Sequence, residues 1–265
     1  MKNDWIHGEQ FFSTIVTKLQ GAGCVFAEDE ARLLIASAEG TAELSDMVEQ
    51  RTSGMPLEHI IGWAEFCGLR ITVDKGVFVP RQRTAFLVRQ ATDLIRQKSV
   101  VLDLCCGSGA VGAVLAHIKQ IELYATDIDP ASVQCTRRNI ITADGHVYEG
   151  DLFEPLPKIL TGRVDVIVAN APYVPTKSIE FLPPEARMHE ARIALDGGSD
   201  GLDVQRRVVA AAPLWLAPGG HLLVETSERQ TPQTVAIFTR CGLKTRVTRS
   251  DELDATVVIG TKTTP

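Results

Sequence analysis

The sequence lacks the patterns that define several large classes of protein. Its six cysteines show no C-x-x-C spacing and its six histidines form no H-E-x-x-H motif, so neither a disulfide framework nor a zinc site is predicted. No apolar run approaches the roughly 18 residues of a membrane-spanning helix. The first residues carry acidic side chains and a histidine where a signal peptide would be apolar. We therefore expect a cytoplasmic protein with reduced thiols, no metal site and no membrane contact.

The chain also lacks an excess of positive charge. It has 27 Lys and Arg against 33 Asp and Glu, and residues 1–50 alone hold three basic and nine acidic side chains. Proteins that bind nucleic acid normally carry a basic surface, so a DNA or RNA substrate is disfavoured. An acidic segment can attract a basic protein partner, but it can equally form an ordinary solvated surface. The charges leave these two interpretations open.

Changes in hydrophobic periodicity divide the chain into three parts. Apolar residues recur at helical spacing within residues 1–55, which predicts a small helical domain. Residues 66–79 change to a two-residue period, with a turn at 74–76, and predict a β-hairpin that links two domains at residues 56–80. From residue 81 to 265 strands and helices alternate, which is typical of an α/β fold with a parallel sheet covered on both faces.

The elements of this third part follow from apolar runs between turn signals. Strands are expected at 100–104, 122–126, 164–169, 221–225, 243–249 and 255–261, and helices at 110–117, 131–141 and 202–216. A further strand is expected just before residue 150. In such sheets ligands bind beyond the carboxyl ends of the strands, where a glycine-rich loop and the segment that begins at residue 170 are found.

The glycine-rich loop follows the first of these strands. Gly107, Gly109 and Gly112 have the G-x-G-x-x-G spacing of dinucleotide-binding proteins, which makes NAD one candidate cofactor. Asp103 directly precedes the loop. Its carboxylate would repel a pyrophosphate, whereas it would attract the ammonium and sulfonium groups of S-adenosylmethionine (SAM). We therefore predict that the loop binds SAM.

Residues around and after the loop fit the methionine and ribose parts of SAM. The backbone at Gly107 and Gly109 can approach a ligand because no Cβ intervenes. Asp127 follows the next strand and can accept hydrogen bonds from both ribose hydroxyls. Asp129 precedes Pro130 and is equally well explained as the N-cap of a helix.

The adenine of SAM has its own candidates in the segment GDLFEPL at 150–156. Asp151 is expected to bind the adenine amino group. Leu152 or Phe153 is expected to cover the ring.

An amide, a proline and an aromatic ring stand together where the strand at 164–169 ends. A planar NH₂ group is a poor nucleophile, because its lone pair is delocalised into an amide or an aromatic ring. The side-chain oxygen of Asn170 and the backbone carbonyl of Ala171 can accept its two N–H protons and direct the lone pair at a methyl group. Pro172 fixes the backbone, and Tyr173 supplies a wall for a flat substrate. These four residues predict a catalytic site for N-methylation that works by positioning and electrostatics, without a metal.

Together these segments resemble a known family, the protein-(glutamine-N5) methyltransferases that modify release factors or a ribosomal protein. The segments that carry the resemblance are PLEHIIGWAEFCGLRITVDKGVFVPR, VLDLCCGSGAVG, ATDIDPASV, GDLFEPL, NAPYVP and ALDGGSDGLDVQRRVVAAAPLWLAPGGHLLVE. The resemblance implies a monomer with a seven-stranded, Rossmann-like SAM-dependent methyltransferase domain and a helical N-terminal domain that helps to hold a protein substrate.

The resemblance also implies roles for particular residues. The loop from Cys105 to Gly109, which includes Ser108, should contact SAM, as should Asp127, Leu152 and Asn170. Residues 170–173 should hold the glutamine amide.

Three departures from the family pattern predict a related subgroup with its own substrate. Ala171 replaces the first proline of the usual N-P-P-Y, Cys105 replaces a glycine of the loop, and Arg83 and Ala85 stand where acidic residues are usual. Two alternatives stay open. An adenine-N6 methyltransferase would use the same tetrapeptide on DNA or RNA, and a non-catalytic SAM-binding scaffold would retain only the fold.

Overall fold

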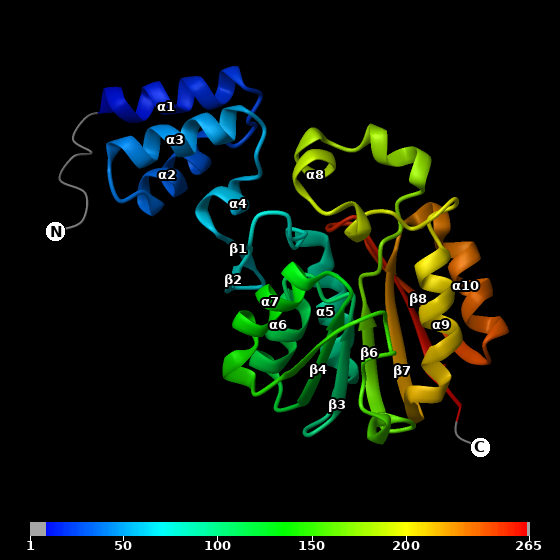
Figure 1. The fold of residues 1–265 in the computed structure, drawn as a ribbon. Coiled ribbons are helices and arrows are strands. Elements are labelled where there is room, and N and C mark those ends of the chain that lie inside the picture. The colour runs from blue at the N-terminus through cyan, green and yellow to red at the C-terminus, as the bar shows by residue number, and fades with distance from the viewer. Residues whose placement is uncertain (1–8, 264–265) are drawn as a thin grey trace.

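The computed structural model describes residues 9–263. Three helices form a small bundle at the N-terminal end of this range, to one side of the larger part of the molecule (Figure 1); they are α1 (Glu9–Gly21), α2 (Ala27–Ser37) and α3 (Thr41–Thr52). The bundle has a core of its own, in which Leu19, Leu34 and Leu44 are at most 1% exposed. Each helix is therefore held by the burial of one apolar face.

The hairpin that follows turns earlier than the sequence pattern indicates. After the short helix α4 (Leu57–Ile61), β1 (Trp63–Phe66) pairs antiparallel with β2 (Leu69–Thr72). Cys67 and Gly68 connect the strands with φ of 51° and 78°. Two successive residues at positive φ are typical of the two-residue turns that match the twist of a hairpin. A turn does form at 74–76, where the Val77 N–H donates to the Asp74 carbonyl at 3.1 Å. The prediction that this turn joins the strands of the hairpin was wrong, because the apolar residues beyond it are buried outside the hairpin.

The larger part is built on a seven-stranded sheet, which confirms the predicted α/β class. Its strands are β3 (Val100–Leu104), β4 (Glu122–Asp127), β5 (His146–Glu149), β6 (Val164–Ala169), β7 (Leu216–Thr226), β8 (Leu243–Ser250) and β9 (Ala255–Lys262). Their order across the sheet is β5-β4-β3-β6-β7-β9-β8. Strand β9 runs antiparallel to both of its neighbours, and the remaining pairs are parallel.

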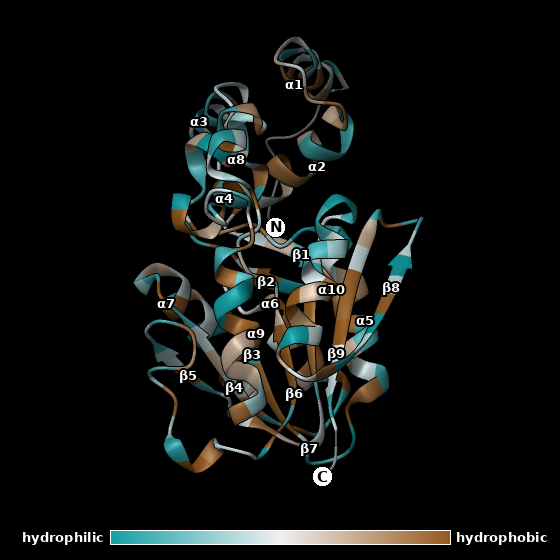
Figure 2. Ribbon diagram, turned by 90° about the vertical axis from the view of Figure 1, so that its right-hand side faces the viewer, coloured by the Kyte–Doolittle hydropathy of each residue, from teal (hydrophilic) through white to brown (hydrophobic). Residues whose placement is uncertain are grey.

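Helices cover both faces of the sheet. One face packs against α5 (Ala85–Leu94), α6 (Ala110–Ile118) and α7 (Pro130–Asn139), and the other against α9 (Asp203–Trp215) and α10 (Thr231–Arg240). Successive strand residues point to opposite faces, so in β3 Val101 packs with the first group of helices and Leu102 with the second. Both faces are therefore apolar, and the central strands are largely brown in Figure 2. Within residues 9–263, no helix has both the length and the apolar character that crossing a membrane requires.

A long connection between β6 and α9 extends beyond the carboxyl ends of the strands. It contains the 3₁₀ turns η4 (Thr176–Phe181) and η5 (Arg192–Ala194) and the helix α8 (Pro184–His189), and Figure 1 shows it next to the N-terminal helices. Two ion pairs hold it to earlier parts of the chain. Arg51 pairs with Glu185 at 2.6 Å, and Arg81 pairs with Glu190 at 2.7 Å.

Arg51 in α3 joins three segments of the chain. Besides Glu185, its guanidinium pairs with Glu30 of α2 at 2.5 Å and donates to the Met55 carbonyl at 3.2 Å. Burial by itself lowers the pKa of Arg51, but the hydrogen bonds and charges of the two carboxylates outweigh it and raise the pKa. The side chain is only 10% exposed and that of Glu30 is 12% exposed, so this ion pair is largely buried, whereas Glu185 is 46% exposed.

Replacing Arg51 by methionine is expected to lower the free energy of unfolding by about 2–4 kcal/mol, because Glu30 would be left buried without its partner. Urea denaturation followed by circular dichroism measures the change. The matched control is Arg32→Met: Arg32 is 59% exposed and pairs with Glu28 and Asp29 at the surface, so the expected loss is below about 0.5 kcal/mol. Equal losses in the two variants would contradict a special role for the Arg51 pairs.

Candidate active site

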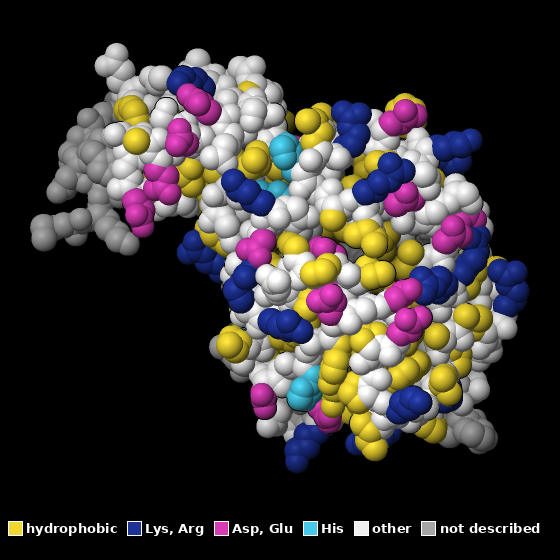
Figure 3. All heavy atoms as spheres, in the orientation of Figure 1, with side chains coloured by type: hydrophobic (Ala, Val, Ile, Leu, Met, Phe, Trp, Pro, Cys, Tyr) yellow, Lys and Arg dark blue, Asp and Glu magenta, His cyan; other side chains and the backbone are white. Residues whose placement is uncertain are grey.

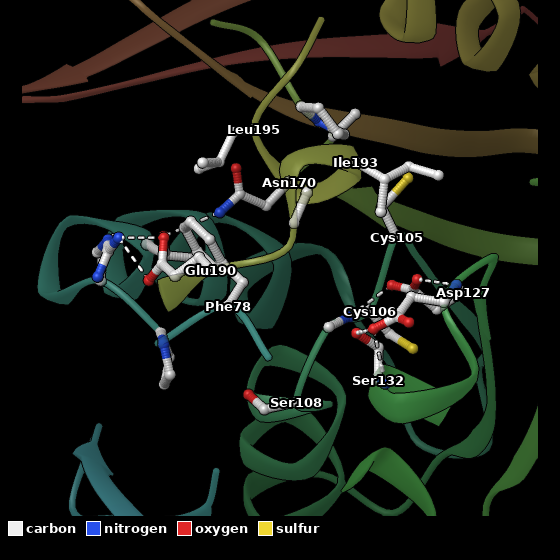
Figure 4. A pocket seen from close by; sticks show the side chains of 18 of the residues that line it. Phe78, Cys105, Cys106, Ser108, Asp127, Ser132, Asn170, Glu190, Ile193 and Leu195 are labelled. Atoms are coloured by element: carbon white, nitrogen blue, oxygen red, sulfur yellow. Dashed lines mark hydrogen bonds and ion pairs between the residues drawn. The ribbon is translucent and has the colours of Figure 1, made fainter. Parts of the chain in front are cut away.

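The carboxyl ends of strands β3, β4 and β6 open into a cavity of about 710 Å³. That volume is within the range of sites that bind small molecules. Strand β3 lies between β4 and β6. From β3 the chain continues to β4 and β5 on one side of the sheet, and then crosses to β6 and β7 on the other side. Ligands bind at such a switch point in open α/β sheets. Figure 4 shows that Asp127 and Cys106 lie on one side of the cavity, with Asn170 and Glu190 across from them.

The loop after β3 supplies part of the cavity wall through Gly107 and Ser108. The Gly107 N–H donates to Asp127 Oδ2 at 2.8 Å, and the Gly107 carbonyl accepts from the Thr136 hydroxyl at 2.8 Å. No atom lies within 4 Å of where a Cβ of Gly107 would be. The two hydrogen bonds therefore fix the backbone of Gly107, while the space next to its Cα stays open.

Gly109 is needed for a different reason from the one expected. It does not line the cavity. Its φ is +75°, and an added Cβ would lie 2.7 Å from Cγ2 of Thr136 in α7. The glycine at this position thus allows the start of α6 to pack against α7. The approach of the Gly109 backbone to the cofactor stays a prediction.

Asp127 is the last residue of β4 and faces the cavity. Its Oδ2 accepts from Gly107 and its Oδ1 accepts from the Asp129 N–H at 2.9 Å. Burial raises the pKa of Asp127, and these backbone N–H groups oppose the shift. Because a carboxylate oxygen has two lone-pair sites, each oxygen can accept one further hydrogen bond. Asp129 also caps α7, since its side chain accepts from the N–H groups of Ala131 and Ser132.

Asp103 lies deeper, at 3% exposure, and also lines the cavity. Its Oδ2 accepts from the Gly112 N–H at 2.9 Å. Burial raises the pKa of Asp103 to about 7; the Gly112 N–H opposes this shift and the charge of Asp127 adds to it. A cationic group bound nearby would favour the ionised form, whereas a phosphate would repel it. This end of the cavity is therefore suited to a positively charged ligand.

Cys105 lines the cavity in the left-handed conformation, with φ of 54°. Burial raises the pKa of its thiol, and the charges of Asp127 and Asp103 add to the shift. The thiol is therefore neutral at physiological pH. A cysteine here takes up cavity space that a glycine would leave free.

The segment after β5 divides between the cavity and the core. Asp151 and Leu152 line the cavity, and Asp151 Oδ2 accepts from Arg207 at 2.6 Å. Phe153 lies elsewhere: it is 6% exposed and stacks on Trp215 of α9 with ring centroids 5.6 Å apart. The prediction that Phe153 covers the adenine is corrected, since its ring is committed to the core beneath α9.

Asn170 follows β6 and lines the cavity opposite the glycine-rich loop. Its Nδ2 donates to Oγ1 of Thr84, at the end of the 3₁₀ turn η1 (Gln82–Thr84), at 3.2 Å. One of the two N–H donors of the amide is thereby occupied. The side-chain oxygen of Asn170 stays available as an acceptor.

The next three residues, Ala171, Pro172 and Tyr173, also line the cavity and are supported from behind. Gln230 donates from Nε2 to the Tyr173 carbonyl at 3.0 Å. A Cβ on Gly201, whose φ is +78°, would lie 2.3 Å from that same carbonyl. Gly201 thus lets its loop pack directly on residues 170–173, and this packing fixes the backbone of the tetrapeptide.

The ring of Tyr173 remains a neutral phenol. Its hydroxyl lies 3.5 Å from Oε1 of Glu225. Burial raises the pKa of Tyr173 to about 12, and the charge of Glu225 adds to the shift while Arg83 opposes it. Tyr173 can therefore act as a wall and a hydrogen-bond donor, but not as a base near neutral pH.

Other wall residues were not singled out from the sequence: Phe78, Thr84, Glu190, Ile193, Leu195 and Arg207. Thr84 lies within the family-like segment PRQRT, which is a signal that could have identified it. The others come from distant segments that the fold brings together. Glu190, for example, is buried and accepts from the Val79 N–H at 3.1 Å as well as from Arg81.

The doubly covered sheet, the glycine-rich loop with its acidic residues and the Asn170 tetrapeptide define a SAM-dependent methyltransferase. The family model for the methyltransferase small domain matches residues 68–199. The release factor glutamine methyltransferase of Geobacter sulfurreducens is 38% identical over 225 residues, which are 84% of this chain and 78% of that protein. The chain therefore belongs to the release factor glutamine methyltransferase family.

Solved structures with low sequence identity show the same fold. A methyltransferase from Pyrococcus furiosus has a TM-score of 0.57 at 18% identity and covers 83% of this chain and 99% of its own. A 16S rRNA methyltransferase of Thermus thermophilus, in complex with AdoMet and guanosine, has a TM-score of 0.55 at 20% identity and covers 76% of this chain and 49% of its own. SAM is the cofactor of this class.

Proposed function

We propose that this enzyme methylates the N5 side-chain amide of a glutamine in a release factor. Its family membership supports the substrate. The observation that carries the proposal is the bond from Asn170 Nδ2 to Thr84, because it leaves the Asn170 oxygen to accept from a substrate N–H. The buried Ala171 is the next residue in the cavity wall, and its backbone carbonyl is proposed as the second acceptor.

Bound SAM supplies an electrophilic methyl group on its sulfonium. We assign contacts with it to the cavity residues near the glycine-rich loop: Asp103, Cys105, Gly107, Ser108, Asp127, Asp151, Leu152 and Asn170. Among them, Asp127 has one free lone pair on each oxygen for a pair of ribose hydroxyls. Asp103 faces the part of the ligand that is positively charged. Asp151 already pairs with Arg207, so one of its two oxygens remains for the adenine amino group.

At the substrate end, the protein works by orientation. Two acceptors fix the two N–H bonds of the glutamine amide, so its lone pair is directed along one line. Pro172 and the loop behind it keep the acceptors in place, and the neutral ring of Tyr173 packs against the flat amide. These residues would stabilise the positive charge that develops on the nitrogen as it takes the methyl group from the sulfonium, which would leave as S-adenosylhomocysteine while one N–H proton passes to solvent.

We further propose how the protein substrate is bound. Residues 1–55 would form a substrate-binding domain, residues 56–80 a linker, and residues 81–265 the catalytic domain of a monomer. Glu28 and Asp29 in the first turn of α2 are exposed, which fits a basic protein surface. On the face drawn in Figure 3, basic and acidic side chains are interspersed and form no continuous basic patch, which does not favour a nucleic acid there. Because release factors act in translation, we place the enzyme in the cytoplasm.

Incubation of the purified enzyme with a release factor and radiolabelled SAM tests the proposal. Label should enter the protein, survive nuclease and disappear with protease, and peptide mapping should place one methyl group on a glutamine. Replacing that glutamine by asparagine in the substrate should abolish transfer. Label that nuclease removes would instead favour adenine methylation. No heat on titration with SAM or S-adenosylhomocysteine would favour a non-catalytic scaffold.

A further inference from the structure

A buried carboxylate lies behind the residues that bind the amide. Glu225, near the end of β7, is 2% exposed and is not among the residues that line the cavity. Its Oε1 lies 3.5 Å from the Tyr173 hydroxyl and 3.5 Å from Nε of Arg83. Its Oε2 has no hydrogen-bond partner among residues 9–263. A buried carboxylate oxygen is costly to leave unpaired, so a further donor is expected next to it.

The Thr84 side chain hydrogen-bonds to Asn170 and neighbours this carboxylate. It is 3% exposed, and its Oγ1 accepts from Asn170 Nδ2 at 3.2 Å. A hydroxyl has a single proton, and that proton is not used in the bond from Asn170. Burial raises the pKa of Glu225, and the neighbouring Thr84 hydroxyl and the Arg83 charge lower it in part. A Thr84 proton turned to Glu225 would give the unpaired Oε2 the donor that it lacks.

We propose that Thr84, held by Glu225, is a positioning residue that fixes the orientation of the Asn170 side chain. With its proton committed to an acceptor-only carboxylate, the Thr84 oxygen can only accept from Asn170. The amide must then turn its nitrogen to Thr84 and its oxygen to the cavity. The two ends of an asparagine amide have nearly the same shape, so only such a hydrogen-bond pattern distinguishes them. In the opposite orientation Asn170 would present N–H groups to the N–H groups of the substrate.

This inference rests on the proposed function for its kinetic consequences. Thr84→Val keeps the shape of the side chain and removes the hydroxyl. We expect kcat to fall about 10- to 100-fold, with the affinity for SAM unchanged within about threefold. Thr84→Ser restores the hydroxyl and should recover kcat to within about threefold of the wild type. Thr92→Val is the matched control, because the Thr92 hydroxyl donates to the Val88 carbonyl within α5 and lies outside the cavity wall.

A second variant, Glu225→Gln, tests whether Glu225 is the residue that fixes the orientation of the Asn170 amide. Its amide can donate to Thr84, which frees the Thr84 proton to turn to Asn170. We expect kcat at pH 8 to fall about 10-fold. In the wild type, protonation of Glu225 should have the same effect as the pH decreases through its raised pKa. Among the groups that face Glu225, Tyr173 has a pKa of about 12 and does not titrate in this range, and Arg83 contributes a positive charge.

The informative quantity is the difference between the two pH profiles, measured at saturating SAM. The Asp103 carboxyl, with a pKa of about 7, is present in both proteins and affects both profiles alike. In the wild type, kcat should decrease on the acid side of the profile because Glu225 becomes protonated. In Glu225→Gln this decrease in kcat should be absent. Superimposable profiles would overturn the proposal, as would a Thr84→Ser variant as slow as Thr84→Val, or a Thr84→Val variant with wild-type kcat.

A readout without substrate separates this proposal from the proposed function. Asn170 is one of three asparagines in the chain, so its side-chain NH₂ signal can be assigned by nuclear magnetic resonance. Its protons should exchange slowly with water in the wild type and faster in Thr84→Val and Glu225→Gln. Unchanged exchange in both variants would overturn the positioning role. Absence of methyl transfer by the wild-type enzyme would contradict only the substrate assignment.

Discussion

Asn170→Ala is expected to lower kcat by about 10²–10³-fold. A loss of this size is typical when one preorganised hydrogen-bonding group that stabilises the charge of a transition state is removed. The side-chain oxygen of Asn170 is one of the two proposed acceptors that hold the amide of the substrate. Alanine leaves the second acceptor, the Ala171 carbonyl, in place. One N–H would then be free, the nitrogen would stay planar, and its lone pair would remain delocalised into the carbonyl. The rate of methyl transfer with saturating release factor and SAM measures the loss.

Binding measurements provide the control for this variant. SAM affinity, from calorimetry, should change by less than about fivefold, because Asn170 is only one of the cavity residues assigned to the cofactor. The thermal midpoint should stay close to that of the wild type, since the side chain is only partly buried and has a single hydrogen bond to Thr84. Near-normal turnover would remove Asn170 from the proposed mechanism. A fall in SAM affinity as large as the fall in kcat would make it a cofactor residue instead.

The sequence predicted those features that depend on local pattern. Strands β3, β4 and β6 were predicted because their apolar runs are buried on both faces, and the ends of these strands position the loop after β3, Asp127 and Asn170. Asp129 was anticipated as an N-cap because it directly precedes Pro130. These signals lie within a few residues of the feature that they specify, so packing elsewhere does not alter them.

Features that depend on packing between distant segments were not predictable in this way. Phe153 lies one residue beyond the cavity-lining Leu152, and only its contact with Trp215, 62 residues later in the sequence, shows that its ring belongs to the core. The hairpin turn at Cys67 and Gly68 carries a cysteine at positive φ, which no turn rule favours. The bond between Thr84 and Asn170 joins residues 86 positions apart. Spacing in the sequence contains no information on such pairs.

Asp127→Ala is expected to weaken SAM binding by about 10- to 100-fold, because charge-assisted hydrogen bonds contribute about 1.5–3 kcal/mol. Asp127 lines the cavity and each of its oxygens can accept one further hydrogen bond, and the same carboxylate holds the Gly107 N–H and the Asp129 N–H. The substitution would therefore remove the proposed ribose contacts and loosen the loop that forms the adjacent wall. Isothermal titration with SAM and with S-adenosylhomocysteine measures both affinities.

Asp165→Ala separates this effect from a general loss of structure. Asp165 is also a strand residue whose carboxylate accepts from a backbone N–H, that of Val100 at 2.8 Å, but it lies toward the amino end of β6, away from the cavity. Both variants should lose some stability, and only Asp127→Ala should lose affinity for SAM. Because the ribose hydroxyls are common to cofactor and product, the two ligands should weaken by the same factor in Asp127→Ala. A loss confined to SAM would place the carboxylate at the sulfonium instead, and an unchanged affinity for both ligands would rule out its assignment to the ribose.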